Sequence, residues 1–585
     1  MISARALPAK ESVGEPTAAT RHLCAGVYVD ERFRDLVIDE VCTAPYRRVA
    51  PSYGFDIVPV MHHAWRAAAL STVLRLTLVG AVAIPVLDGA LPCAVLVGCG
   101  LALLWLLRIM RALREADRER RPKRTSKRRK WELAIISGDF LGSLFPWRKT
   151  EKPPVFRRIR VVAFSVTATG AAVAVADPGQ ALAALAVAAG VAVMCLGVGA
   201  TRQLMLNRIH RTRSLRPARL SGRQRVADLQ QRHACVVYRR PRHSEDDEDE
   251  EEDPAFFTLF GDRSPFIGAG ELVYQWNPPM SIQLLRPSDD DGAQLHDLEH
   301  QEPPFQTHEL VDYLRNAVRL LDTDNQDVRL PAQVRDRVYV AETDVAADPS
   351  LLARPLDGAE LRSVINNTPA ARRHHFLEVT TPMAGSEYVA TVLLRVGVQG
   401  RTLSISMAAC VLAHTPRSFQ RTGEFGQHGA TAVVWSAFRE LSTLPQEIQK
   451  SWRIVRHLRA LGKAAVLPRD LTSEPRRNLL IGSRVSIRET SSQAWSKVQL
   501  EKGDILGQMK TIELRLLRAA SDFLSTKDVD ISEFTNRAMK IINSGIFNFG
   551  DNNSFNNNAV GDAAHVGVSG NQPAGSGNSS AGGNQ

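Results

Sequence analysis

The chain has 585 residues and a mean hydropathy of −0.15, so it is longer than one ordinary domain and on average no more apolar than a soluble protein. Its formal net charge of +11 at pH 7 suits nucleic acid or anionic lipid, and the positions of the cations decide between these partners. Its seven cysteines are scattered and form no C-x-x-C pair, which argues against a disulfide framework and against a zinc site.

The first segment of the chain is polar. Residues 1–19 lack the apolar core of a cleavable secretory signal, so we expect them to be disordered and to stay on the inner side of a membrane. Residues 20–65 carry apolar positions at helical spacing and are predicted to form a small cytoplasmic helical segment. His62 and His63 are adjacent and point in different directions on a helix, which disfavours a metal site there.

Four apolar runs follow in two pairs. The first pair, residues 67–107, is divided by a turn at Asp88, and the second pair, residues 161–200, is divided by a turn at Asp177. Each run approaches the ~20 residues that cross a hydrocarbon core of ~30 Å. We therefore predict an α-helical membrane region of four transmembrane helices in two hairpins, in preference to buried helical hairpins of a soluble protein.

Arginine flanks the four runs everywhere except at the two turns. Lys and Arg near the ends of membrane helices favour the cytoplasmic side. The flanking residues are Arg66, Arg108, Arg111, Arg114, Arg157, Arg158, Arg160, Arg202 and Arg208. This pattern predicts a plasma-membrane protein with both termini in the cytoplasm.

Arg75 lies about two turns inside the first run, where a charge is costly and can mark a functional site. Its long side chain is also able to reach the lipid headgroups, and no acidic residue within the four runs can pair with it. We favour the headgroup interpretation. A transporter, which normally needs several polar groups at mid-depth, is correspondingly less favoured.

The cytoplasmic loop between the hairpins, residues 108–160, is strongly basic. Its densest part is a candidate lipid-binding site formed by Arg118, Arg120, Arg121, Lys123, Arg124, Lys127, Arg128, Arg129 and Lys130. Such a cluster gains about 1 kcal/mol per cation at an anionic leaflet. Because interleaved aromatic residues are missing, we expect a lipid bilayer with anionic headgroups as the partner and no nucleic acid; a plain topology signal is a compatible alternative.

Residues 131–147 continue this loop with a largely apolar stretch that has a Trp at each end. Tryptophan favours the boundary between lipid and water, so we predict an interfacial segment, with a short core helix as the alternative.

A linker follows the second hairpin. Residues 201–243 form a basic juxtamembrane segment, and residues 244–253 carry an uninterrupted acidic run from Glu245 to Asp253. A block of like charges repels itself and stays disordered. We hypothesise that this acidic run competes with lipid for the basic cluster that precedes it.

Residues 254–419 alternate short apolar runs with Pro, Gly and Asp, a texture typical of β-strands. The clearest pair, residues 388–398 and 402–414, is separated by a short loop and predicts a β-hairpin. A helical pattern at residues 307–321 makes this a cytoplasmic α+β domain rather than an all-β one.

Two features of this domain are candidates for chemistry. Gly268 and Gly270 lack the third glycine of a dinucleotide-binding loop, so nucleotide binding is disfavoured. His374 and His375 have no nucleophile or carboxylate at a recognisable spacing, so a structural role is favoured. The sequence therefore predicts no catalytic residue, no cofactor and no metal ligand.

Residues 429–543 return to helical spacing. Residues 451–467 are basic and amphipathic, and such a segment suits either a membrane surface or neighbouring helices. Residues 502–525 carry an apolar stripe at steps of four and three, which predicts one buried helix face. The stripe consists of Ile505, Met509, Ile512, Leu516, Ala519 and Phe523.

The Asn- and Gly-rich tail, residues 545–585, contains no Lys or Arg and is predicted to be disordered. Its first half holds a candidate assembly segment with the apolar residues Ile546, Phe547, Phe549 and Phe555. Asn ladders and stacked Phe rings stabilise cross-β stacking. Residues 545–570 resemble the C-terminal amyloid signalling motifs of bacterial conflict proteins, which implies possible self-assembly through the tail; a plain disordered tail is the alternative.

A second resemblance spans most of the chain. The blocks TRHLCAGVYVDERFRD, APSYGFDIVPV, SPFIGAG and DVDISEF together resemble a group of uncharacterised multi-pass membrane proteins from high-GC Gram-positive bacteria. The resemblance implies a shared topology and compartment and carries no information about chemistry.

These patterns favour a non-enzymatic scaffold or signalling component that acts through cytoplasmic protein–protein contacts with an unknown partner. One alternative is a membrane-tethered enzyme whose active site is assembled from residues far apart in the sequence. A second alternative is a small channel or transporter.

Overall fold

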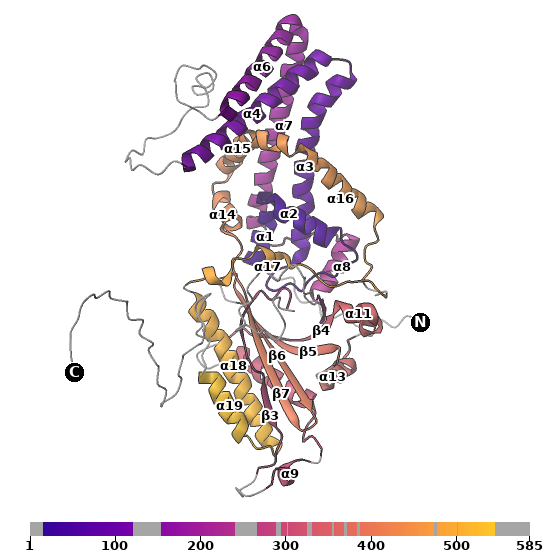
Figure 1. The fold of residues 1–585 in the computed structure, drawn as a ribbon, viewed down its shortest axis with the longest axis vertical. Coiled ribbons are helices and arrows are strands. Elements are labelled where there is room, and N and C mark those ends of the chain that lie inside the picture. Colours follow the sequence, from indigo (N-terminus) through magenta and orange to yellow (C-terminus); the bar gives the residue numbers. More distant parts are fainter. Residues whose placement is uncertain are drawn as a thin grey trace, which may run out of the picture.

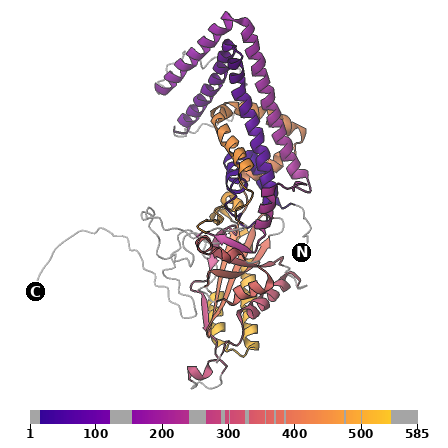
Figure 2. The same cartoon turned by 90° about the vertical axis from the view of Figure 1, so that its right-hand side faces the viewer.

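The computed structural model describes residues 16–120, 154–239, 266–287, 294–300, 302–323, 330–353, 356–367, 371–382, 386–472, 477–499 and 501–543. These residues form three tiers along the longest axis of the molecule (Figure 1). Long apolar helices make the first tier, shorter helices the second, and a β-sheet with flanking helices the third. A view turned by 90° shows the same order of tiers (Figure 2).

The first tier comprises the long apolar helices α3 (Ile57–Leu87), α4 (Leu91–Arg120), α6 (Pro154–Ala176) and α7 (Pro178–Arg211). Within the described part of the chain, these four helices are long and apolar enough to cross a membrane. Aspartates cap two of them: Asp56 accepts a hydrogen bond from the Val58 amide at 3.1 Å, and Asp177 accepts one from the Gln180 amide at 3.2 Å. Helix α6 packs mainly along α4 rather than along α7, its neighbour in the chain.

Two of these helices extend beyond the first tier. Helix α3 has 31 residues and α7 has 34, so at a rise of ~1.5 Å per residue both are longer than a hydrocarbon core of ~30 Å. Residues 57–68 of α3 are therefore free to pack among the shorter helices, where most of them are buried. Leu206 and Ile209 of α7 join the same core.

The second tier is built from α1 (Ala18–Val29), α2 (Glu31–Leu36), the π-helix η1 (Val37–Cys42), α8 (Gly222–Gln231), α14 (Arg417–Gly426), α15 (Ala430–Gln449), η3 (Ser451–Arg453), α16 (Ile454–Val466) and α17 (Ile487–Ser491). Phe419 of α14 packs directly on α1, where a Cβ added to Gly26 would lie 2.5 Å from its ring. This tier thus joins the start of the chain to segments that follow the sheet.

The third tier contains one mixed sheet in the described residues. Its strands are β1 (Cys235–Tyr238), β2 (Glu271–Gln275), β3 (Met280–Gln283), β4 (Gln333–Ala341), β5 (Arg373–Pro382), β6 (Val389–Gln399) and β7 (Thr402–Leu412). Their order is β1-β4-β5-β6-β7-β2, with β3 also paired to β7, and only β1 and β4 run parallel. The predicted hairpin is confirmed, since β6 and β7 pair from Val389–Leu412 to Gln399–Thr402 around Gly400, whose φ is 60°.

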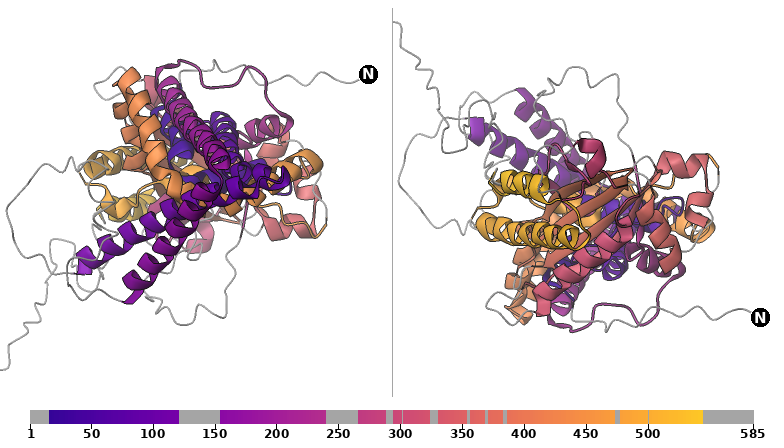
Figure 3. Two further views of the ribbon diagram at one scale, coloured as in Figure 1. Left: turned by 90° about the horizontal axis from the view of Figure 1, so that it is seen from above. Right: turned by 90° about the horizontal axis from the view of Figure 1, so that it is seen from below.

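Helices cover one face of this sheet. The predicted helix at residues 307–321 is confirmed as α10 (Thr307–Thr323), and the predicted stripe at residues 502–525 lies on α18 (Glu501–Thr526) with all of its members buried. Both helices share one apolar core with the sheet. Helix α19 (Ser532–Asn543) lies beside α18, as the view from below shows (Figure 3).

The other face of the sheet packs against chain segments rather than long helices. Leu393 of β6 faces Tyr53, which precedes α3, and Phe266, while its neighbour Leu394 faces the helix-covered side. Shorter elements complete the tier: α9 (Leu295–Leu298), α11 (Glu342–Ala347), α12 (Ser350–Ala353), α13 (Gly358–Asn366) and η4 (Trp495–Lys497).

The helices that follow residue 429 divide between two tiers. Helices α15 and α16 contact the long apolar helices, whereas α18 and α19 complete the apolar core under the sheet. Strand β1 comes from the segment that the sequence marks only as basic, because Cys235, Val236 and Val237 are buried there. The predicted interfacial segment 131–147, the acidic run 245–253 and the tail 545–585 lie outside the described residues.

Candidate functional site

Helix α15 lies across the long apolar helices and receives an arginine from three of them. It is seen between α14 and α3 in Figure 1. The three contacts are Arg75 Nε to Glu447 Oε2 at 3.0 Å, Arg108 Nη1 to Gln449 Oε1 at 2.8 Å, and Arg202 Nη1 to Glu440 Oε2 at 2.9 Å. One helix thus binds polar side chains of α3, α4 and α7 together.

Small residues allow α15 to approach α7 closely. The hydroxyl of Ser436 donates a hydrogen bond to the Gly199 carbonyl at 3.2 Å. A Cβ added to Gly199 would lie 2.9 Å from the Ser436 carbonyl oxygen and 3.0 Å from Ala437 Cα. Gly199 is therefore required for backbone-to-backbone packing between the two helices.

Arg75 does not extend to the lipid headgroups, so that prediction is wrong. The side chain is 1 % exposed, and its guanidinium lies between Glu31 and Glu447, at 2.5 Å and 3.0 Å. These partners belong to α2 and α15, which lie outside the four apolar runs. The reasoning from the runs alone therefore missed them.

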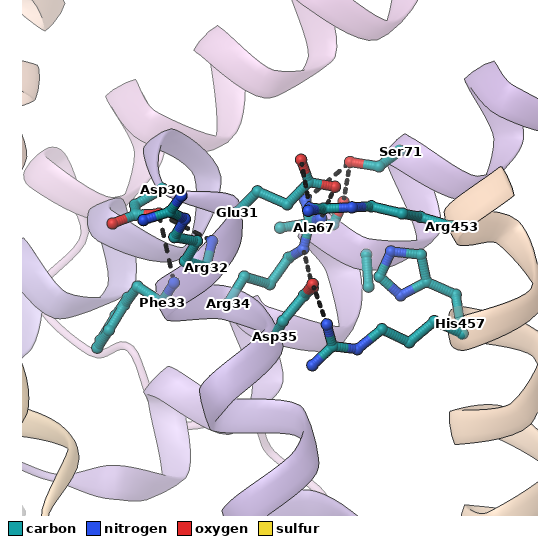
Figure 4. Close-up of polar contacts among 12 residues, drawn as sticks. Asp30, Glu31, Arg32, Phe33, Arg34, Asp35, Ala67, Ser71, Arg453 and His457 are labelled. Atoms are coloured by element: carbon teal, nitrogen blue, oxygen red, sulfur yellow. Dashed lines mark hydrogen bonds and ion pairs between the residues drawn. The ribbon is translucent and has the colours of Figure 1, made fainter. Parts of the chain in front are cut away.

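Glu31 is the centre of this site. It accepts contacts from Arg75 at 2.5 Å, Lys450 at 2.7 Å, Arg34 at 3.1 Å and Arg453 at 3.4 Å. Burial alone would raise the pKa of its carboxyl, but hydrogen bonds from Lys450 and Arg75 lower that pKa to about 2. Figure 4 shows Glu31, Arg34 and Arg453 converging between the helices.

The capping of α2 places Glu31 in this position. The Asp30 carboxylate accepts a hydrogen bond from the Arg32 amide at 2.8 Å, so α2 starts at Glu31 and its first turn faces α3. On the same face, Arg34 Nη1 donates to Ser71 Oγ of α3 at 2.8 Å. The cap and the contact with α3 together orient the carboxylate.

Helix α16 is attached to the same elements. Arg456 lies 3.5 Å from Asp35 of α2 and 2.5 Å from Asp39 of η1, and His457 Nε2 lies 3.4 Å from Arg75 Nη1. We refer to these residues as the arginine network: Glu31, Arg34, Asp35, Asp39, Arg75, Glu447, Lys450, Arg453, Arg456 and His457. It joins α2, η1, α3, α15, η3 and α16.

The energetic role of the network follows from its burial. A buried ion pair adds little to the free energy of unfolding compared with apolar residues of equal volume. Removing one partner, however, leaves an unpaired buried charge and lowers that free energy by about 3–5 kcal/mol. Arg75 and Arg34 are both buried, so each requires its acidic partners to remain in place. The network consequently fixes the arrangement of α2, α15 and α16 around α3.

A second polar site joins α1 to the sheet. The Glu387 carboxylate, two residues before β6, lies 2.5 Å from His22 Nδ1 and 3.3 Å from His414 Nδ1, and accepts a hydrogen bond from the Thr415 amide at 2.8 Å. Burial would raise the pKa of Glu387, but hydrogen bonds from His22 and His414 hold it well below its usual range. We call this site the Glu387 junction.

Arg488 of α17 contacts the backbone next to the Glu387 junction. Its buried guanidinium donates to the Tyr53 carbonyl at 2.7 Å and also to the Glu387 carbonyl. Gly54 allows this approach, since a Cβ there would lie 2.7 Å from Arg488 Nη1. The segment that leads into α3 is thereby bound to the sheet.

The glycines of PFIGAG are explained by packing within the chain. Both have positive φ values, 95° at Gly268 and 98° at Gly270. A Cβ at Gly268 would lie 2.6 Å from the Pro51 carbonyl oxygen, and one at Gly270 would lie 2.1 Å from that of Val411. The Gly268 amide donates to Glu489 at 2.7 Å, and burial raises the pKa of that carboxyl to about 7.

The candidate histidines have protein partners. His375 Nε2 lies 2.9 Å from Asp336 on the neighbouring strand, His374 Nδ1 lies 3.2 Å from Arg395, and His63 Nδ1 lies 3.1 Å from the Tyr28 hydroxyl. Among the described residues, no group of three or more His, Cys, Asp and Glu side chains is arranged to hold a metal ion.

The predicted lipid-binding cluster is described only in part. Arg118 and Arg120 belong to the last turn of α4, while Arg121 to Lys130 lie outside the described residues. The candidate assembly residues Ile546, Phe547, Phe549 and Phe555 also lie outside them. The structure therefore does not test these two sites.

Comparison with known proteins gives one match. Residues 275–556, less than half of the chain, match the family model of the AbeC-like domain. The matched segment begins at the end of β2 and includes α15, α16 and α18, but not the four long apolar helices. No curated protein and no solved structure matches the chain. The match supports a family without an assigned activity.

The depressed pKa of Glu31 predicts a specific pH dependence. Because the folded-state pKa lies below the unfolded value, the stabilisation is present above about pH 4.5, is on the order of 3 kcal/mol, and is lost as the pH falls toward 2. Glu31→Gln should therefore lower the thermal unfolding midpoint in detergent at pH 7. The difference between the variant and the wild type should shrink steadily between pH 5 and pH 3.

Glu533→Gln is the matched control, because Glu533 pairs with Arg537 on the exposed surface of α19. It should leave the midpoint nearly unchanged at every pH. A Glu31→Gln deficit that stays constant from pH 7 to pH 3 would show that the charge of Glu31 is not what stabilises the fold.

Proposed function

We propose that the chain is a multi-pass plasma-membrane protein with α3–α4 and α6–α7 as two transmembrane hairpins and both termini in the cytoplasm. We further propose that it is a non-enzymatic scaffold or signalling component that acts through cytoplasmic protein contacts. The observation that carries this proposal is the binding of α3, α4 and α7 by α15, because it joins the apolar helices directly to the matched AbeC-like segment.

The topology is supported by the positions of turns and charges. Only Asp88, Gly89 and Ala90 separate α3 from α4, and only Asp177 separates α6 from α7. The arginines lie toward the opposite helix ends, and at those ends α3 and α7 join the core of the second tier. The positive-inside rule then puts these tiers in the cytoplasm.

The packing between the apolar helices favours an anchor over a channel. Leu74 and Leu78 of α3, Val97 of α4, and Val191 and Val198 of α7 form one apolar cluster. A conducting path needs polar groups or a water-filled space at this depth. An apolar interior of this kind suits helices that anchor the second and third tiers to the membrane.

Two further contacts belong to the proposal. The cations from Arg118 to Lys130 begin in the last turn of α4 and continue along the chain after it, so in this topology they meet the anionic headgroups of the inner leaflet. The Asn- and Gly-rich tail with Phe547 and Phe549 provides a segment for assembly with a second copy or with a partner.

Cysteine labelling in intact bacterial cells tests the topology. Asp88→Cys and Gly179→Cys should react with a membrane-impermeant maleimide before permeabilisation, because both turns lie outside. Asp522→Cys, on the exposed side of α18, should react only after permeabilisation. The wild-type chain gives the background of its native cysteines. Labelling of all three variants only after permeabilisation would contradict the proposed spanning arrangement.

Cross-linking in native membranes tests the scaffold role. The full chain should capture a reproducible protein, or a second copy of itself, and this capture should be lost when residues 545–585 are removed. Phe547→Asp should produce the same loss if the tail assembles through stacked apolar residues. Identical capture by all three chains would show that the tail is not the contact site.

A further inference from the structure

Helices α15 and α16 each expose a group of large apolar side chains. We refer to α15, η3 and α16 together as the ledge. Its exposed apolar residues are Val434, Trp435, Phe438, Trp452, Val455, Leu458, Leu461, Val466 and Leu467. Trp435 and Trp452 are each 70 % exposed, and groups of exposed apolar side chains that include tryptophan mark a contact with a partner or a membrane.

Three different faces run along α16. Ile454, His457 and Ala460 are buried against the second tier, at the helical spacing of three. Val455, Leu458 and Leu461 repeat at the same spacing on a second face and are exposed. Arg456, Arg459 and Lys463 form the third face, which is basic and also exposed.

The contacts of Arg456 orient these faces. Arg456 pairs with Asp35 and Asp39, so it is directed toward α2 and η1, while Arg459 and Lys463 are exposed. The exposed apolar face is a separate strip of the helix that no described element covers. A helix with one apolar face and adjacent cations is the form that lies in the boundary between lipid and water.

The ledge is also continuous with the apolar helices. Helix α15 touches α7 through Gly199 and meets α4 through Arg108, the residue that follows the second apolar run. The exposed Trp435 and Phe438 extend from the opposite side of α15. Because α15 contacts both α4 and α7, a bilayer that surrounds these two helices also borders α15.

We propose that the ledge lies in the inner leaflet of the membrane and binds anionic phospholipid headgroups. Its apolar side chains enter the acyl-chain boundary, and Arg459 and Lys463 contact the lipid phosphates. This inference rests on the proposed function, since it requires that α3, α4, α6 and α7 span the bilayer. It adds a lipid-binding surface that lies in the matched AbeC-like segment and far in sequence from the spanning helices.

Fluorescence quenching in nanodiscs tests the inference on the full chain. An environment-sensitive nitrobenzoxadiazole label is attached to Leu458→Cys, and the nanodiscs contain phospholipids with a nitroxide on the acyl chain. The account predicts about twofold quenching of this label, as expected for a group at the acyl boundary. Val455→Cys, on the same face, should behave alike and replaces Leu458→Cys if that variant folds poorly.

Two reference positions separate the possible failures. Phe164→Cys, exposed on α6, reports whether the chain spans the membrane at all, and Leu229→Cys, exposed on α8, should remain unquenched. Quenching at position 164 without quenching at 458 overturns the ledge proposal and leaves the proposed function standing. Absence of quenching at position 164 overturns the proposed function itself.

The headgroup specificity has its own comparison. Quenching at position 458 should increase when phosphatidylglycerol replaces about a third of the phosphatidylcholine, and Arg459→Gln with Lys463→Gln should remove that increase. Arg225→Gln with Arg518→Gln removes two exposed cations elsewhere and should retain it. Equal quenching in both lipids overturns the anionic preference. A label that is shielded from water yet not quenched by lipid means that a protein covers the ledge, which also overturns the proposal.

Discussion

The burial of Arg75 is the constraint on which the upper part of this structure depends. A guanidinium that is withdrawn from water requires acidic partners, and these come from Glu31 on one side and Glu447 on the other. Glu31 fixes the position of α2, and Glu447 fixes that of α15. Because η3 and α16 follow α15 directly in the chain, the ion pair between Arg75 and Glu447 also positions them beside α3.

The same principle continues toward the sheet. Glu387 is held between His22 of α1 and His414, two residues after β7, and the buried Arg488 donates to the carbonyl groups of Tyr53 and Glu387. Buried charges with specific partners add to the apolar packing between the tiers, because each charge requires its own partner to stay in place. They therefore define how α1 and the segment before α3 meet the sheet.

Local patterns in the sequence predicted a large part of the fold. The four apolar runs, the hairpin of β6 and β7, and the buried stripe of α18 all depend on spacings within a short window. Each of these predictions is confirmed, because the residues that form the pattern are close in sequence and lie on the same element or on adjacent elements. The helices do extend further than the runs, since apolar length alone does not show where a helix continues into a second core.

The candidate site was not predictable in this way. Arg75 meets Glu31 across 44 positions and Glu447 across 372, and no local spacing connects residues so far apart. The one signal available was the presence of a charge inside an apolar run, which correctly marks a special position but does not identify its partners. A small residue in an apolar helix, such as Gly199, is compatible with close helix packing but does not identify α15 as the neighbour.

The central claim is that Arg75 and Glu447 act as a pair that holds α15 against α3. A double-mutant cycle with Arg75→Gln and Glu447→Gln, read out as the free energy of local opening of α15 by hydrogen exchange in nanodiscs, tests it most directly. The account predicts a coupling of about 1 kcal/mol or more, and additivity within about 0.5 kcal/mol when Arg75→Gln is combined with Glu440→Gln, whose partner is Arg202. If the effects of Arg75→Gln and Glu447→Gln are additive, as those of Arg75→Gln and Glu440→Gln are expected to be, the claim that Arg75 and Glu447 act as a pair is contradicted.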